Sequence, residues 1–192
     1  MSFEWLVLMI GCGVVIGSAL FIRGLPSIGW MLLLRTLFWA IIPAVVVLYI
    51  PYLIVTRWQP TTVTRWGVPQ FLSLIPITIG SALFVHCIWL FAAIGRGTLS
   101  PLDPPKRFVV RGLYRYVRNP MYVVCLVILF GEALFFQSTA LLKYALGWFV
   151  LIHLVVVLIE EPTLQDQFGE SYARYRRKVR RWVVGRPYDD NI

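Results

Sequence analysis

The chain has 192 residues, of which 59% are hydrophobic and 14% are charged, and its mean hydropathy is +0.75. A soluble domain typically has about 25% charged residues, so this composition excludes a soluble globular protein and predicts an integral membrane protein. The net charge of +9 does not indicate nucleic-acid binding, because the Lys and Arg residues lie between and after apolar segments, where such residues face the cytoplasm and anionic lipid headgroups.

The apolar segments predict an all-α, polytopic membrane protein with about five transmembrane helices. The first three segments, at 5–22, 31–55 and 68–94, form a predicted scaffold over residues 1–94. The first lacks the basic n-region and small-residue cleavage site of a signal peptide, so we expect it to be retained as a span. Pro43 and Pro51 predict kinks in the second segment.

The second half, residues 95–192, contains two further predicted spans at 120–136 and 140–159, joined by a tight turn at 137–139. Pro120 suits the first turn of a helix. After Pro162 the apolar residues recur at spacings of three and four, which predicts an amphipathic helix on the membrane surface or over the preceding polar loop. Its predicted apolar face contains Leu164, Phe168, Tyr172, Tyr175, Val179 and Trp182.

The distribution of positive charge predicts the orientation of the five spans. Fifteen of the 18 Lys and Arg residues fall on one side, and Arg57, Arg65 and Lys143 fall on the other. By the positive-inside rule the polar loop 95–119 and the C-terminus are cytoplasmic, and the N-terminus is outside. The three cysteines, Cys12, Cys87 and Cys125, lie singly in apolar stretches, so we interpret them as buried hydrophobic residues without metal or disulfide partners.

Three polar clusters are expected to meet at the cytoplasmic surface. Gly95-Arg96-Gly97 either brings backbone amides close to a ligand or only ends a helix. Residues 103–122 are basic and aromatic, and Arg118 and Asn119 precede the free amides of a helix start, which favour anionic groups. Glu160 and Glu161 end an apolar span; they either pair with loop arginines or hold a ligand's ammonium or hydroxyl groups.

The order of these clusters resembles that of membrane methyltransferases, which include isoprenylcysteine carboxyl methyltransferases and phospholipid N-methyltransferases. The resemblance lies in the glycine pair, then Gly-Leu-Tyr-Arg-Tyr-Val-Arg-Asn-Pro-Met-Tyr, then Glu-Glu-Pro-Thr-Leu and Phe-Gly-Glu-Ser-Tyr. It covers residues 95–182. It implies that residues 95–192 bind S-adenosylmethionine at the cytoplasmic face, and that the protein is an S-adenosylmethionine-dependent methyltransferase.

The resemblance also implies a set of cofactor-binding residues. These are Gly95, Gly97, Val109, Tyr114, Asn119, Pro120, Met121, Tyr122, Glu160 and Glu161. Two departures from the family's pattern bear on the methyl acceptor. Asn119 replaces a histidine, so that position cannot titrate, and Val155-Val156-Val157 stands where prenylcysteine enzymes have a substrate-contacting arginine. The acceptor, a phospholipid amine, a carboxylate or another hydrophobic molecule, is therefore left open.

Methyl transfer from a sulfonium is an in-line displacement that depends mainly on proximity and alignment. We assign Arg118 as the catalytic or substrate-orienting residue. Two alternatives are an NADPH-dependent membrane sterol-type reductase and a non-enzymatic membrane subunit or small transporter. A transporter would need a polar path through the bilayer, and His86, Glu132 and His153 do not form an evident one. We interpret the histidines as packing hydrogen-bond formers and Glu132 as solvated at the outer interface.

Overall fold

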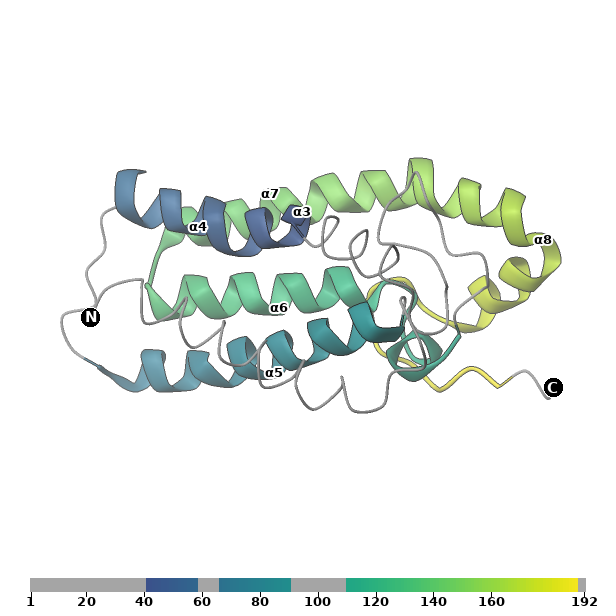
Figure 1. Ribbon diagram of the computed structural model, residues 1–192, viewed down its shortest axis with the longest axis horizontal. Coiled ribbons are helices and arrows are strands. Elements are labelled where there is room, and N and C mark those ends of the chain that lie inside the picture. Colours follow the sequence, from purple (N-terminus) through teal and green to yellow (C-terminus); the bar gives the residue numbers. More distant parts are fainter. Residues whose placement is uncertain (1–40, 59–65, 91–109, 190–192) are drawn as a thin grey trace, which may run out of the picture.

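The computed structural model describes residues 41–58, 66–90 and 110–189, and all regular structure within these ranges is helical. Four apolar helical segments lie side by side along the long axis of the molecule, and the C-terminal part of the chain gathers at one end of them (Figure 1). The all-α prediction is thus confirmed for the described residues. The number of spans and their orientation stay predictions.

The first described segment alternates α-helical and π-helical turns. It consists of α3 (Ile41–Ala44), η1 (Val45–Tyr49), α4 (Ile50–Leu53) and η2 (Ile54–Trp58). Pro43 and Pro51 each precede a π-helical turn by a few residues, as expected where a missing backbone N–H interrupts the regular hydrogen-bond ladder. The segment continues to Trp58, three residues beyond the predicted end at 55.

Helices α5 (Val68–Leu90) and α6 (Pro120–Phe135) form the most extensive contact between described elements, and glycines permit their close approach. A Cβ atom built on Gly80 would stand 2.7 Å from Ile128 Cγ1, and one built on Gly131 would stand 2.7 Å from Ile77 Cγ1. Each glycine therefore accepts an isoleucine of the other helix, as small residues do in membrane helix pairs.

Replacing Gly131 with alanine is expected to destabilise the protein by about 1–3 kcal/mol, the usual cost of overpacking a core. The stiff, β-branched Ile77 would have to move, because the added methyl group also lies 3.4 Å from the Ile77 backbone nitrogen. Thermal unfolding in detergent micelles measures the effect. Gly147→Ala is the matched control, because nothing lies within 4 Å of a Cβ there. Equal stability of the two variants would contradict this account of the α5–α6 contact.

A tight turn joins α6 to α7 (Thr139–Val155), as predicted. Gln137 adopts a positive φ of 48°, and the Ser138 hydroxyl accepts a hydrogen bond from the Leu141 backbone N–H at 3.2 Å. This N-cap satisfies an N–H group that has no partner within the helix. Helix α7 then continues without a break through η5 (Val156–Glu160) into α8 (Glu161–Lys178), which bends at Gly169 (φ 52°).

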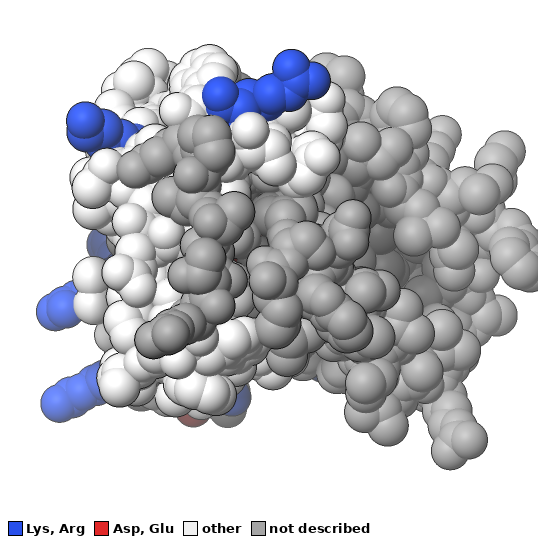
Figure 2. All heavy atoms as spheres, turned by 90° about the vertical axis from the view of Figure 1, so that its left-hand side faces the viewer, with Lys and Arg blue, Asp and Glu red and all other residues white. Residues whose placement is uncertain are grey.

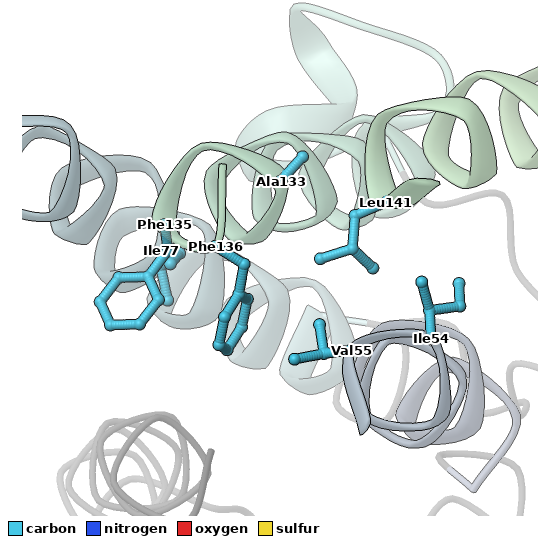
Figure 3. Close-up of a cluster of buried hydrophobic side chains, with 7 residues drawn as sticks. All are labelled: Ile54, Val55, Ile77, Ala133, Phe135, Phe136 and Leu141. Carbon is cyan, nitrogen blue, oxygen red and sulfur yellow. The ribbon is translucent and has the colours of Figure 1, made fainter. Parts of the chain in front are cut away.

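The end of the bundle opposite α8 is closed by a cluster of buried hydrophobic side chains from four helical segments (Figure 3). Its members are Ile54, Val55, Ile77, Ala133, Phe135, Phe136 and Leu141. Two polar contacts brace it: Gln70 Nε2 donates to the Phe135 carbonyl at 3.0 Å, and the Tyr144 hydroxyl donates to the Val46 carbonyl at 2.9 Å. These contacts hold α5 to α6 and α7 to η1.

Large apolar side chains are exposed along the outer faces of the helices. They include Phe71, Leu72 and Ile75 on α5, Phe130 and Leu134 on α6, and Leu146, Val150, Leu151 and Leu154 on α7. Monomeric soluble proteins rarely expose contiguous apolar patches of this extent. Two of the described helices, Val68–Leu90 and Thr139–Lys178, are long and apolar enough to cross a membrane, while Ile42–Trp58 and Pro120–Phe135 are apolar but shorter. These features indicate a membrane protein.

Candidate functional site

The C-terminal segment 179–188 doubles back along residues 115–119. Backbone hydrogen bonds join Arg118 N–H to the Arg180 carbonyl at 2.9 Å, Gly185 N–H to the Tyr116 carbonyl at 2.9 Å, and Tyr188 N–H to the Arg115 carbonyl at 2.8 Å. The predicted amphipathic helix is therefore wrong at its end: α8 stops at Lys178, Val179 is extended, and Trp182 lies beyond the helix. The returning segment places Arg181 and Trp182 beside residues at the ends of α6 and α7.

Glu161 lies at the centre of an ion-pair cluster. Its side chain accepts two hydrogen bonds from Arg181, from Nε at 2.7 Å and from Nη2 at 2.9 Å, and its Oε1 lies 2.9 Å from Arg118 Nη1. Glu161 is only 5% exposed. Burial would raise the pKa of Glu161, but the hydrogen bond from Arg181 and the charges of Arg118 and Arg181 hold it below its ordinary value, so the carboxylate stays ionised. The same hydrogen bond raises the pKa of Arg181.

Arg118 has donor atoms that this ion pair does not satisfy. Its side chain is 10% exposed. Although Nη1 is within ion-pair distance of Glu161, neither Nη1 nor Nε makes a well-directed hydrogen bond to any described group. A buried guanidinium donor without a partner is costly, and such exceptions call for an explanation. The geometry leaves Arg118 able to bind an acidic ligand group.

Glu160 has a different partner from its neighbour. The Tyr122 hydroxyl on the first turn of α6 donates a short hydrogen bond to Glu160 Oε1. Glu160 follows the apolar part of the predicted span, and burial together with the charge of Glu161 raises its pKa, against the effect of the Tyr122 hydrogen bond. The adjacent acids thus differ in chemistry: Glu161 is a paired carboxylate, whereas Glu160 is more readily protonated.

Aromatic rings form a wall beside these acids. Tyr122 packs edge-on against Trp148, with ring centroids 6.2 Å apart. Trp182 Nε1 donates to His153 Nδ1 at 3.0 Å, and its ring contacts Phe149 at a centroid distance of 5.4 Å. The predicted hydrogen-bonding role of His153 is confirmed, although its partner comes from the returning segment. In the neutral imidazole this bond leaves the proton on Nε2.

The other predicted cofactor-binding residues differ in how they are placed. Tyr114 in the 3₁₀ turn η4 (Gly112–Arg115) is buried against Cys87 and Leu90, and its carbonyl accepts from the Tyr175 hydroxyl at 2.6 Å. Pro120 is fully buried, and Met121 packs on the same cluster as Tyr114. Asn119 Nδ2 donates to the Arg181 carbonyl at 3.3 Å. Gly95, Gly97 and Val109 lie outside the described residues.

Two further polar residues, Glu132 and His86, lie on α6 and α5. Glu132 is 0% exposed and makes no hydrogen bond to any described residue, so the predicted solvation at the outer interface is wrong. It lies in the apolar interior because α6 turns this face toward its neighbours rather than toward the membrane surface. His86 stacks on Trp89 with ring centroids 6.0 Å apart and lies against Gly112, whose φ of 56° suits glycine.

The residues that sequence reasoning missed come from α8 and the returning segment. Arg181 binds Glu161, and no sequence pattern singled it out. Tyr172 was assigned only to the apolar face of an amphipathic helix, yet it is buried near Arg118, whose charge opposes the rise that burial causes in the Tyr172 pKa. A paired acid at the end of a span requires a cation. However, the sequence contains 18 cations and no local signal that selects Arg181.

Comparison with known proteins identifies related chains. Residues 70–171, more than half of the chain, match the sequence model of the phospholipid methyltransferase family. A methanethiol S-methyltransferase of Crocosphaera subtropica is 26% identical over 147 residues, which cover 66% of this chain and 53% of that protein. This chain thus spans about half of that relative's length. An uncharacterized protein of Haemophilus influenzae is 32% identical over 63 residues, which cover 33% of this chain and all of that protein. No solved structure matches.

Proposed function

Since the chain belongs to the phospholipid methyltransferase family, we propose that it is a membrane methyltransferase that uses S-adenosylmethionine and methylates a lipid or another hydrophobic acceptor. The observation that carries this proposal is the Arg118 guanidinium, whose buried Nε has no hydrogen-bond partner among the described residues, beside two acids of different chemistry. Together they present a cationic and an anionic group at the same end of the helices.

These residues fit a methyl donor of the amino-acid type. The Nε donor of Arg118 suits a carboxylate, and Glu160, with Tyr122, suits an ammonium or ribose hydroxyl groups. When bound, S-adenosylmethionine supplies a methyl group on a positively charged sulfur. Asn119, Pro120, Met121 and Tyr114 act in this proposal mainly by shaping the turn before α6. Gly95, Gly97 and Val109 complete the predicted set.

Glu161 has a positioning role in this proposal. By binding Arg181 through two hydrogen bonds it ties the returning segment to the start of α8, and it holds Arg118 by the ion pair. This fixed geometry matters because the rate of a displacement at carbon depends strongly on the orientation of its reactants. The aromatic wall of Tyr122, Trp148 and Trp182 offers an apolar face to the acceptor. His153 is bonded through Nδ1 to Trp182, which disfavours it as the base.

For the acceptor we propose a class only: a hydrophobic molecule that enters from the bilayer. The family name suggests a phospholipid amine, and the resemblance to a methanethiol S-methyltransferase suggests a small thiol. Both can reach a site at the membrane surface. A carboxylate acceptor is the third chemical class. Incubation with methyl-labelled S-adenosylmethionine distinguishes these classes, because the extracted product that carries the label identifies the acceptor.

Calorimetric titration of the detergent-solubilised protein with S-adenosylhomocysteine tests the cofactor. We expect the wild type to bind and Glu160→Gln to bind about 10–100-fold more weakly, because a hydrogen bond to a charged group contributes about 1.5–3 kcal/mol. Glu170→Gln, which removes an exposed acid of α8, is the matched control and should bind like the wild type. Absence of binding by the folded wild type would refute S-adenosylmethionine dependence. Unchanged binding by Glu160→Gln would refute only the role of Glu160.

A further inference from the structure

A pocket lies at the end of the helices opposite the acids. It has a volume of about 710 Å³, within the range of about 300–1,000 Å³ that is typical of ligand sites. It lies between the end of the first described segment and the first turns of α7. Its lining residues are Ile50, Leu53, Ile54, Arg57, Trp58, Ala140, Lys143 and Tyr144.

The pocket combines an apolar wall with two exposed cations. Ile50, Leu53 and Ile54 supply the wall, and Arg57 and Lys143 come from two different helical segments. No acid is among the lining residues that the structure describes. Figure 2 faces this end of the molecule: blue side chains stand out along the upper edge, and the described surface beside them carries no red. The pocket is therefore complementary to a ligand with an anionic group and an apolar tail.

Among the described residues, Lys and Arg are scarce at this end, so the position of Arg57 and Lys143 at one pocket is informative. All other Lys and Arg residues in the described ranges lie at 111–118 or 174–186, near the candidate functional site. Trp58 is 84% exposed beside Arg57, an arrangement typical of the membrane–water interface. Two side chains that could extend separately into water instead border the same apolar pocket.

The pocket is distinct from the candidate functional site. Lys143 and Glu161 lie on one continuous helical path, and their separation in sequence corresponds to about 27 Å of helix rise. This distance approaches the thickness of a bilayer's hydrocarbon core, about 30 Å. The two sites therefore face opposite surfaces of the membrane, and a lipid in the pocket would not occupy the methyl-transfer site.

We propose that this pocket binds an anionic phospholipid of the surrounding bilayer. The phosphate lies between Arg57 and Lys143, and an acyl chain follows Ile50, Leu53 and Ile54. The contacts of the two basic side chains with the anionic headgroup supply the selectivity. Burial of the acyl chain supplies an attraction that does not depend on the headgroup. The proposal does not depend on methyl transfer.

Photolabelling in nanodiscs tests the proposal. The full chain is placed in phosphatidylcholine nanodiscs that contain a trace of phosphatidylglycerol with a diazirine in its acyl chain, and labelled peptides are mapped by mass spectrometry. We expect label in peptides that contain residues 50–58 and 140–144. Unlabelled phosphatidylglycerol should compete with it, and phosphatidylcholine should not. In Arg57→Gln/Lys143→Gln the label at these peptides should fall about 30-fold, as expected from two lost charge contacts.

Two further variants separate site binding from general effects of charge. Arg174→Gln/Arg177→Gln removes two exposed cations of α8 and should keep the label at 50–58 and 140–144. Arg57→Lys/Lys143→Arg retains both charges and should keep it as well. Equal competition by phosphatidylcholine in the wild type would overturn the proposal whether or not the variants fold. Undiminished labelling of the folded Arg57→Gln/Lys143→Gln variant would also overturn it.

Discussion

Replacing Glu161 with glutamine is expected to abolish measurable methyl transfer and to weaken S-adenosylhomocysteine binding by at least about 100-fold. Glutamine has nearly the same volume but leaves Arg118 and Arg181 as neighbouring cations without a counter-charge. Removing one partner of a buried ion pair typically costs about 3–5 kcal/mol. The returning segment would lose its link to α8, so we also expect a lower unfolding temperature in detergent.

The pH dependence of stability tests whether the loss of stability in Glu161→Gln is caused by the missing charge of Glu161. The folded protein binds the Glu161 proton more weakly than the unfolded chain does, because the pKa of Glu161 is lowered from its ordinary value of 4.5. The stabilisation is therefore present above pH 4.5 and is lost as the pH falls through the lowered pKa. The stability of the wild type should fall in this pH range, and Glu161→Gln should lack the part of the fall that is due to protonation of Glu161. The charge of Glu161 also raises the pKa of Glu160, so Glu160 is replaced by glutamine in both proteins that are compared.

Glu170→Gln is the control for this experiment, since it removes an exposed carboxylate from the same helix. It should retain activity, ligand binding and the pH profile of the wild type. A Glu161→Gln protein with normal activity would show that the ion-pair cluster is not needed for the site. A loss of stability with full ligand binding would assign Glu161 to folding alone.

Arg118→Lys is expected to lower kcat/KM for the methyl donor by about 100-fold while leaving stability nearly unchanged. Lysine keeps the charge beside Glu161, whereas the planar set of guanidinium donors is lost. Nε, which has no hydrogen-bond partner among the described residues, is the atom that we assign to the ligand, while Nη1 is paired with Glu161. The exchange therefore separates ligand binding from the neutralisation of Glu161. Steady-state kinetics and S-adenosylhomocysteine titration measure the two effects.

Arg111→Lys provides the same exchange at an exposed position of the same loop. It should behave like the wild type in both assays. If Arg118→Lys also does so, Arg118 serves only as a counter-ion, and the ligand assignment is wrong. A large loss of stability in Arg118→Lys would instead show that Tyr172 and Glu161 require the guanidinium for packing.

Local patterns in the sequence predicted the helical part of this protein well. The helix that begins at Pro120, the turn at 137–139 and the start of α7 all depend on contacts between residues close in the chain. The same patterns failed where the chain leaves a regular period. The spacing of three and four continued to Trp182, but the segment after Lys178 takes its backbone hydrogen bonds from residues 115–118 instead of from its own turns.

The amino-acid sequence alone determined the class of the protein, the apolar segments and the residue types of the candidate site, because composition and short-range periodicity suffice for these. Only the tertiary structure decided how Glu160 and Glu161 divide their partners, which of many arginines binds Glu161, and that Glu132 is buried. Tyr122 is 38 residues from Glu160, and Arg181 is 20 residues from Glu161. Such pairs depend on how helices pack and where the chain turns back, and local sequence preferences do not specify either.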